Sequence, residues 1–165
     1  MWSSATKSGQ SPYLQRKKIA GENIRYLPDG SILIPMINYA APRESAFVGV
    51  QTIKPDGTKL FPKGVIKSGS ACRLGEINTR IMAVCEGYAT ACSIRLGTGY
   101  QLPVFVAFDA GNLIKIVTML RHLYPKTHVL VCADNDQKTK GNPGIKAGRL
   151  AVRANQNSSI INHGN

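Results

Sequence analysis

The chain has 165 residues, of which 43% are hydrophobic and 18% charged, which argues against wholesale disorder and suits one well-packed domain with a small second lobe. Its 21 Lys and Arg residues exceed its 9 Asp and Glu residues, and the net charge of +12 favours a polyanionic partner such as nucleic acid. A basic surface without a ligand is the competing explanation. No apolar run reaches the ~18–20 residues that a membrane span needs, and no signal-peptide core is visible at the N-terminus.

The four cysteines, Cys72, Cys85, Cys92 and Cys132, lack the C-x-x-C spacing of zinc sites, and no histidine lies at a suitable distance from two of them. Inside strands and helices Cys behaves as a small hydrophobe. The cysteines therefore argue against structural zinc and indicate a reducing, cytoplasmic location.

The first half of the chain predicts a basic α+β subdomain over residues 12–78, after a disordered lead-in over residues 1–11. A short helix is expected over Ser11–Ala20, because Ser is a good N-cap and Pro is tolerated at the first helical position. Pro35 favours a sheet edge or a bulge, because proline lacks the donor that a central ladder needs. The expected strands are Ile32–Ile37, Ala46–Ile53 and Thr58–Phe61, the last two joined by a hairpin turn at Pro55-Asp56-Gly57.

From residue 79 to residue 165 the pattern changes to strand–helix–strand, which demands a parallel sheet with crossover helices. Apolar runs without polar alternation are typical of strands buried on both faces. The expected strands are Ile81–Cys85, Val104–Phe108, Val129–Ala133 and Ser158–Ile161, and the expected helices are Tyr88–Leu96, Leu113–Leu123 and Ile145–Asn155. The fold class is therefore α/β, a small parallel sheet flanked by helices and preceded by a mostly antiparallel β subdomain.

Acidic side chains follow the ends of two buried strands: Glu86 after the first, and Asp134 and Asp136 after the third. Open α/β sheets place ligand sites at the carboxyl ends of their strands, and alternate residues point to the same side. Clustered carboxylates repel one another without a cation, and such oxygen ligands suit Mg²⁺. We therefore predict a divalent metal site for phosphoryl transfer on these three acids. The alternative is a turn in which the Asp side chains accept hydrogen bonds from backbone amides.

Asp109 follows the remaining buried strand and has two interpretations. The favoured one is that it caps the helix that begins near Gly111, because Asp is a common N-cap. Its place at a strand end also makes it a candidate metal ligand.

Basic residues gather in and after the predicted hairpin and in a later polar loop. Loops of Lys and Gly approach phosphates closely, because Gly leaves the backbone accessible and Lys supplies a point charge. Lysines that protect a sheet edge are the alternative. Gly87 and Gly144 are expected to let the backbone turn tightly beside the substrate. The candidates for nucleic-acid or nucleotide binding are Lys59, Lys63, Lys67, Arg73, Lys138 and Lys140.

Three blocks of the second half contain or follow the strand-end acids. They are Cys85-Glu86-Gly87-Tyr88-Ala89-Thr90-Ala91, Ala133-Asp134-Asn135-Asp136 and Asn142-Pro143-Gly144-Ile145-Lys146-Ala147-Gly148. Together they resemble the Toprim domain, the catalytic module shared by topoisomerases, bacterial-type primases and some nucleases. In the N-terminal half, the blocks Tyr13–Ile19, Leu33–Met36, Val50–Ile53 and Asp56–Phe61 are similar to primases carried by plasmids, phages and integrated elements. The resemblance runs from about Pro12 to the C-terminus.

This resemblance implies a Toprim fold over residues 79–165 with Mg²⁺ or Mn²⁺ on Glu86, Asp134 and Asp136. It also implies synthesis of short RNA primers from ribonucleoside triphosphates on a single-stranded DNA template. Primases usually carry a zinc-binding module, and some carry a helicase; neither motif occurs in this sequence. We therefore expect a catalytic core, C-terminally truncated, whose helicase or zinc-binding domains lie elsewhere in a longer protein.

Two other functions remain open at this point. One is phosphodiester cleavage by a Toprim nuclease or a topoisomerase-like module, although no separate domain for a catalytic tyrosine is present. The other is a non-catalytic nucleic-acid-binding module. Phe61 is the only aromatic residue among the Lys and Gly residues of the hairpin, so binding by base stacking is poorly supported. The basic N-terminal subdomain favours the primase.

Overall fold

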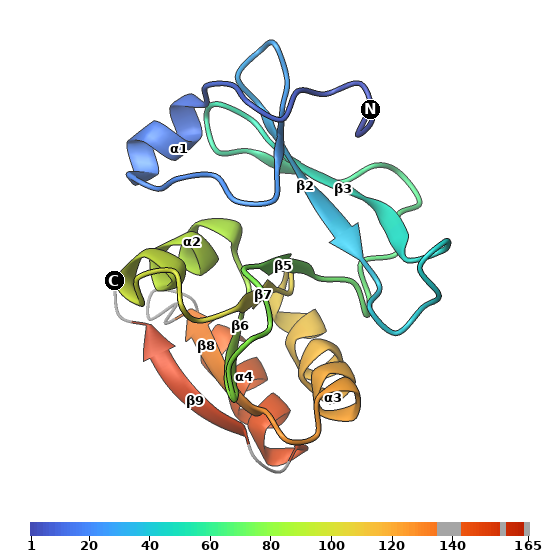
Figure 1. Ribbon diagram of the computed structural model, residues 1–165, viewed down its shortest axis with the longest axis vertical. Helices are drawn as coiled ribbons and strands as arrows, with labels where there is room; N and C mark the ends of the chain where they lie inside the picture. The colour runs from blue at the N-terminus through green and yellow to red at the C-terminus, as the bar shows by residue number, and fades with distance from the viewer. Residues whose placement is uncertain (135–142, 156–157, 164–165) are drawn as a thin grey trace.

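The computed structural model describes residues 1–134, 143–155 and 158–163, which form two lobes that pack against each other (Figure 1). The first lobe is an antiparallel sheet with the strand order β1-β2-β3-β4, beside one short helix. Its elements are α1 (Pro12–Lys17), β1 (Arg25–Tyr26), β2 (Ile32–Ile37), β3 (Phe47–Ile53) and β4 (Lys59–Leu60).

Pro35 lies within β2, although that strand has a neighbour on each side. The neighbour β1 pairs only with Ile32 and Leu33, and the next bridge on that side joins Ile37 to Ala71. Pro35 therefore faces no strand there, and its missing donor costs no ladder bond on that side. The register shifts between Met36 and Ile37, one residue further on. Both features that the proline predicts, a local edge and a bulge, are therefore present.

The N-terminal segment, expected as a disordered lead-in over residues 1–11, lies on the outer face of the first sheet. Thr6 forms a bridge with Tyr26, with N–H to O distances of 3.1 and 2.8 Å, and Ala5 is buried against Leu33 and Val50. The guanidinium of Arg25 lies 5.0 Å from the centre of the Trp2 ring. The sequence predicted disorder because the segment is mostly polar, and the few residues that anchor it gave no recognisable pattern.

The second lobe is a five-stranded sheet with the order β5-β7-β6-β8-β9. The pairs β6–β7, β6–β8 and β8–β9 are parallel, and β5 is an antiparallel edge that the sequence did not predict. The strands are β5 (Cys72–Leu74), β6 (Ile81–Cys85), β7 (Val104–Val106), β8 (His128–Asp134) and β9 (Ser158–His163). The expected fold class is thus confirmed.

Three helices and one 3₁₀ turn connect these strands. They are α2 (Tyr88–Gly97), η1 (Ala110–Asn112), α3 (Leu113–Leu123) and α4 (Pro143–Arg153). The helix α4 begins two residues before the predicted start, since proline is readily accommodated in a first turn. No helix in the described residues is long and apolar enough to cross a membrane.

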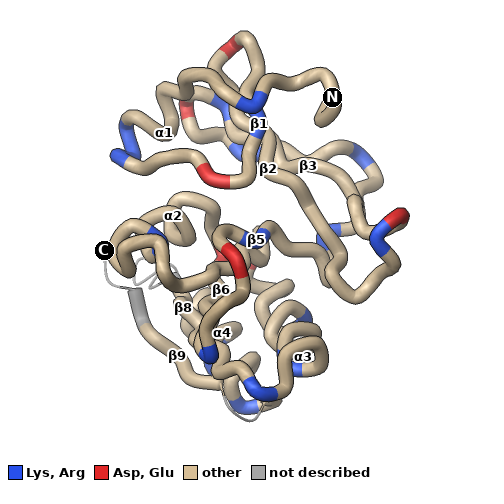
Figure 2. Tube along the Cα trace, in the orientation of Figure 1, with Lys and Arg blue, Asp and Glu red and all other residues tan. Residues whose placement is uncertain are grey.

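Two hydrophobic clusters form most of the buried core, and one of them joins the two lobes. In one, Ile34 of β2 packs with Cys72, Cys85 and Tyr88 of the second lobe, so the core is continuous across both sheets. In the other, α3 and α4 cover the opposite face of the second sheet, with Ile116 and Ala151 among the fully buried residues. The four cysteines are buried, and the described residues contain no disulfide. Figure 2 shows Lys and Arg residues distributed over both lobes.

Candidate active site

The carboxyl ends of β6 and β8 meet at one edge of the second sheet, which we call the catalytic edge. The two strands pair in parallel with Cys85 opposite Cys132, so Glu86 follows one strand where the other continues to its last residue, Asp134. The backbone of both acids therefore reaches the same edge, as the strand pattern predicted. Asp136 and the side chain of Asp134 lie outside the described residues, and the predicted metal triad stays a prediction.

The end of β7 is attached to the same edge by backbone hydrogen bonds. The N–H groups of Ala107 and Phe108 donate to the carbonyl oxygens of Cys85 and Glu86, at 2.8 and 2.9 Å. Phe108 then takes a positive φ of 71°, which is uncommon for a residue with a side chain. This left-handed residue ends the strand and turns the chain towards Asp109.

Asp109 is the N-cap of η1, because its Oδ1 accepts a hydrogen bond from the N–H of Asn112 at 2.9 Å. The capping role that the sequence favoured is therefore present; a role as metal ligand stays a prediction. The other oxygen, Oδ2, lies 2.8 Å from the Nζ of Lys67, and both side chains are a little more than one-third exposed.

The lysine in this pair belongs to the segment that joins the two lobes. The Nζ of Lys67 also lies 4.7 Å from the centre of the Phe61 ring, which contacts the edge of Phe108 at 6.2 Å between centroids. One predicted phosphate-binding lysine is thus held beside the catalytic edge by a carboxylate and an aromatic ring.

The side chain of Asn112 binds the backbone of the segment that joins the two lobes. The sequence did not predict this role. Its side-chain oxygen accepts from the N–H of Gly69 at 2.8 Å, and its Nδ2 donates to the carbonyls of Lys67, Ser70 and Ala107 at 3.1, 2.9 and 2.9 Å. The side chain is buried, so these bonds satisfy groups that water cannot reach. The signal in the sequence, one Asn next to a helix start, was too common to interpret.

Lys59 of β4 also reaches the catalytic edge. Its Nζ lies 3.9 Å from the position that a Cβ on Gly87 would occupy, and Gly87 directly follows Glu86 as the N-cap of α2. A Cβ would fit there in this structure, since the nearest side-chain atom, Thr90 Oγ1, would be 3.7 Å away. Packing within the chain therefore does not require a glycine here, and the prediction that Gly87 makes room for a substrate stays a prediction.

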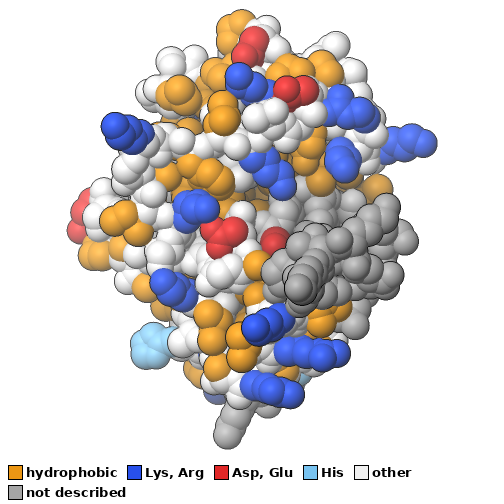
Figure 3. Space-filling view, turned by 180° about the vertical axis from the view of Figure 1, so that it is seen from behind, with side chains coloured by type: hydrophobic (Ala, Val, Ile, Leu, Met, Phe, Trp, Pro, Cys, Tyr) orange, Lys and Arg blue, Asp and Glu red, His pale blue; other side chains and the backbone are white. Residues whose placement is uncertain are grey.

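The remaining predicted basic residues have different surroundings. Lys63 is exposed on the connection after β4. Arg73 lies in β5, where its guanidinium contacts the Glu76 carboxylate at 3.2 Å. Lys138 and Lys140 lie outside the described residues, and Gly144 is in the first turn of α4. Figure 3 shows Lys and Arg side chains on both lobes around a few acidic side chains on this face.

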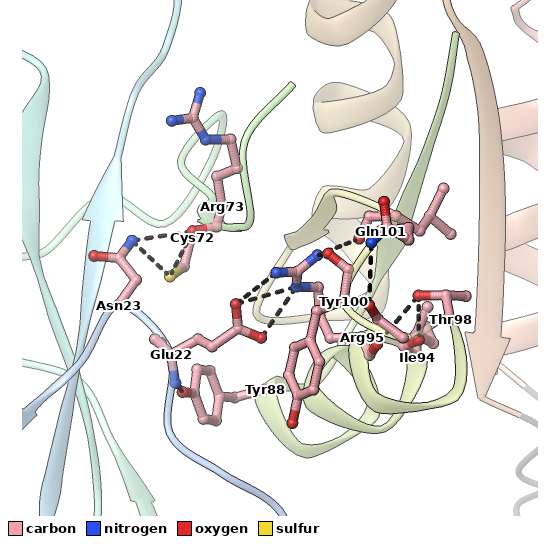
Figure 4. Close-up of polar contacts among 12 residues, drawn as sticks. Glu22, Asn23, Cys72, Arg73, Tyr88, Ile94, Arg95, Thr98, Tyr100 and Gln101 are labelled. Carbon is pink, nitrogen blue, oxygen red and sulfur yellow. Dashed lines mark hydrogen bonds and ion pairs between the residues drawn. The ribbon is translucent and has the colours of Figure 1, made fainter. Parts of the chain in front are cut away.

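A buried network fixes the two lobes beside this site (Figure 4). The guanidinium of Arg95 in α2 binds the carboxylate of Glu22, with Nη2 at 2.8 Å and Nε at 3.0 Å, and donates to the carbonyls of Tyr100 and Leu102. The hydroxyl of Tyr88 bonds the backbone of Glu22, donating to its carbonyl at 2.7 Å and accepting from its N–H at 2.8 Å. Burial raises the pKa of Tyr88 above its ordinary value, so the hydroxyl stays protonated as this donor.

The sequence comparisons identify relatives over the larger part of the chain. Two curated Escherichia coli proteins, each named DNA primase TraC, are 32% identical over 108 residues and 33% identical over 113 residues. The chain is similar to DNA primase TraC. The matches cover 63% and 64% of this chain but only 10% and 8% of the two TraC proteins, so the chain spans about a tenth or less of their length. No protein-family model matches the chain.

Solved primase structures share the fold of this chain. The primase fragment of the bacteriophage T7 primase-helicase has a TM-score of 0.58 at 13% identity, over 90% of this chain and 59% of that one. The DnaG catalytic core has a TM-score of 0.52 at 13% identity, over 93% and 64%. T7 gp4 primase domains bound to an RNA/DNA hybrid and dTTP have a TM-score of 0.57 at 13% identity, over 89% and 71%. The fold is that of primase cores, as the resemblance implied.

Proposed function

We propose that this chain is the catalytic core of a DNA primase that acts in the cytoplasm and makes short RNA primers on single-stranded DNA. The observation that carries the proposal is the junction of the lobes. Glu86 and Asp134 end neighbouring parallel strands, and Lys59 of the first lobe reaches Gly87 at that edge. The similarity to DNA primase TraC and to the T7 gp4 domains with their RNA/DNA hybrid supports the same nucleic-acid partners.

The residues at the catalytic edge fit a divalent metal ion. Two carboxylate-bearing residues end adjacent strands, and a third, Asp136, follows within two positions. Such oxygen ligands suit Mg²⁺ or Mn²⁺, and Glu86, Asp134 and Asp136 would hold the ion. When bound, the ion supplies positive charge for the triphosphate and polarises the attacking hydroxyl.

The basic residues around this edge would bind the phosphates of the incoming ribonucleoside triphosphate. Lys59 and Lys67 bring two positive charges from the first lobe, and the Asp109 carboxylate and the Phe61 ring orient the second of them. Fixed charges at the place where phosphate charge develops lower the barrier without reorganisation during the reaction. Lys63, Arg73, Lys138 and Lys140 are proposed to contact the template or the primer backbone. Helicase or zinc-binding domains in a longer protein would present the template.

The test is primer synthesis on single-stranded DNA with labelled ribonucleotides and Mg²⁺ or Mn²⁺. We expect short RNA products from the wild-type chain and a loss of at least about 100-fold in Glu86→Gln and in Asp134→Asn/Asp136→Asn, because the charge that holds the ion is removed. Glu44→Gln is the matched control, since Glu44 is exposed in the β2–β3 loop. Metal-dependent nicking of DNA without primers, lost in the same variants, would assign a nuclease instead.

A further inference from the structure

The helix α4 presents a row of cations to solvent. Lys146, Arg149 and Arg153 are exposed at the spacing i, i+3, i+7, and Leu150 lies among them on the same face with 51% of its surface exposed. Within residues 1–134, 143–155 and 158–163, none of these three side chains forms an ion pair. The helix contains no acidic residue. We call Lys146, Arg149, Leu150 and Arg153 the α4 stripe.

The orientation of the stripe is fixed by the opposite face of the helix. Gly148 is so close to the sheet that an added Cβ would lie 2.8 Å from Ile160 Cδ1 and 2.9 Å from the Cβ of Ala133. Ala151, one turn later, is completely buried. These small residues allow α4 to pack closely against β8 and β9. The three cations of the α4 stripe therefore point away from the sheet, towards solvent.

The neighbouring helix α3 uses its arginine differently. The guanidinium of Arg121 donates to the carbonyls of Tyr124, Pro125 and Thr127, and so it stabilises the end of its own helix. Arg121 has a structural task that accounts for its charge. The α4 stripe has no comparable partners among the described residues, and its regular spacing therefore needs another explanation.

The stripe begins near the catalytic edge and leads away from it. Since α4 follows the end of β8, its first turn lies on the side where β8 delivers Asp134, and the helix packs against η1 and α3. Figure 3 shows Lys and Arg side chains in the lower half of this face, below the acidic side chains near its middle. A polyanion that leaves the catalytic edge on this side would meet the stripe.

We propose that the α4 stripe binds the sugar–phosphate backbone of the RNA–DNA hybrid that primer synthesis creates. This inference rests on the proposed function, which supplies the hybrid. A rise of ~1.5 Å per residue puts Lys146 and Arg153 ~10 Å apart along the helix axis, and one strand of a duplex carries a phosphate every ~3.4 Å of its axis. The stripe therefore matches about three successive phosphates. No aromatic residue occurs in α4, so unpaired bases would find no stacking platform there.

The experiment measures binding of a short labelled RNA/DNA hybrid and of the corresponding single-stranded DNA by fluorescence anisotropy at several salt concentrations. The variant is Lys146→Gln/Arg149→Gln/Arg153→Gln. The matched control, Lys7→Gln/Lys17→Gln/Arg43→Gln, removes three exposed charges elsewhere. Because binding involves no chemical step, this readout is independent of whether the chain makes primers.

We expect the stripe variant to bind the hybrid more than about tenfold more weakly at moderate salt, with a salt dependence lower by about two to three counterions. The control variant and the binding of single-stranded DNA should change much less. The single variant Arg149→Gln should lower the salt dependence by about one, and it replaces the triple variant if circular dichroism shows that the latter is unfolded. Equal losses on hybrid and single strand, or losses no greater than in the control, would overturn the proposal.

Discussion

The two carboxylate oxygens of Asp109 have different partners, and a single substitution separates them. Oδ1 accepts the capping bond from Asn112, and Oδ2 pairs with Lys67 at 2.8 Å. Asn caps a helix about as well as Asp does, but it carries no charge. Asp109→Asn should therefore keep the cap and lose the attraction that orients the lysine beside the catalytic edge.

For Asp109→Asn we expect a KM for ribonucleoside triphosphates about three- to tenfold higher, equal to about 0.7–1.4 kcal/mol of binding free energy. Because the ion pair is more than one-third exposed, its loss should hardly change the free energy of unfolding. Asp109→Ala removes the cap as well and should cost about 1 kcal/mol of stability. Steady-state kinetics and urea unfolding measure the two effects. An unchanged KM in Asp109→Asn would show that the pair does not position Lys67 for substrate.

At the scale of single residues, the sequence allowed the positions of acids at strand ends to be predicted, but not the roles of polar residues inside the core. Glu86 and Asp134 could be placed at one edge because strand order and strand direction follow from the helices between apolar runs. Asn112 and Arg95 could not be assigned roles, because each also has partners far away in the chain, such as Ser70 at 42 residues and Glu22 at 73 residues. Only the tertiary structure brings such partners together.

Among the secondary-structure elements, α2 has the task of joining the two lobes. It packs its buried residues against β6 and β7, and it carries both Arg95 and Tyr88 to the Glu22 segment (Figure 4). Gly75, with a φ of +78°, passes so close that an added Cβ would lie 2.6 Å from the guanidinium. A long cationic side chain is thus enclosed by a carboxylate, two carbonyls and a glycine turn.

Arg95→Met should destabilise the chain by about 2–4 kcal/mol, because it leaves the half-buried Glu22 carboxylate and two carbonyls without their donor. Urea unfolding followed by circular dichroism measures this loss. Arg73→Met is the comparison, since it removes an exposed Arg–Glu pair three residues apart in sequence and should cost less than about 1 kcal/mol. Similar losses in both variants would mean that the buried pair contributes no more than a surface pair.

Prediction of the elements succeeded where the sequence signal was long. The apolar runs of β6 and β8 and the amphipathic pattern of α3 were interpretable because each extends over five or more residues. The strands β1 and β4 have two residues each and β5 has three, too short for any periodic pattern. These short strands exist because longer neighbours offer them a ladder, which is a property of the sheet and not of the segment.

At the scale of the whole molecule, the catalytic edge depends on both lobes. The acids come from the second lobe, whereas Lys59 and Lys67 come from the first lobe and from the segment between them. The continuous hydrophobic cluster that contains Ile34, Cys85 and Tyr88 fixes one lobe on the other. Separation of the lobes would expose this shared cluster, and with it the inner face of each sheet, to water.

We therefore expect the two lobes to unfold in a single transition. The chain has one tryptophan, Trp2 on the first lobe, whereas the helices α2, α3 and α4 all belong to the second lobe. Trp fluorescence and the far-UV circular dichroism of the helices thus report mainly on different lobes during the same urea titration. Coincident midpoints are the expected result for a two-state protein of this size. If the fluorescence changed at clearly lower urea than the circular dichroism, the first lobe would unfold alone. The lysines could then leave the catalytic edge while the acids stayed in place, and the shared core would not be what holds the site together.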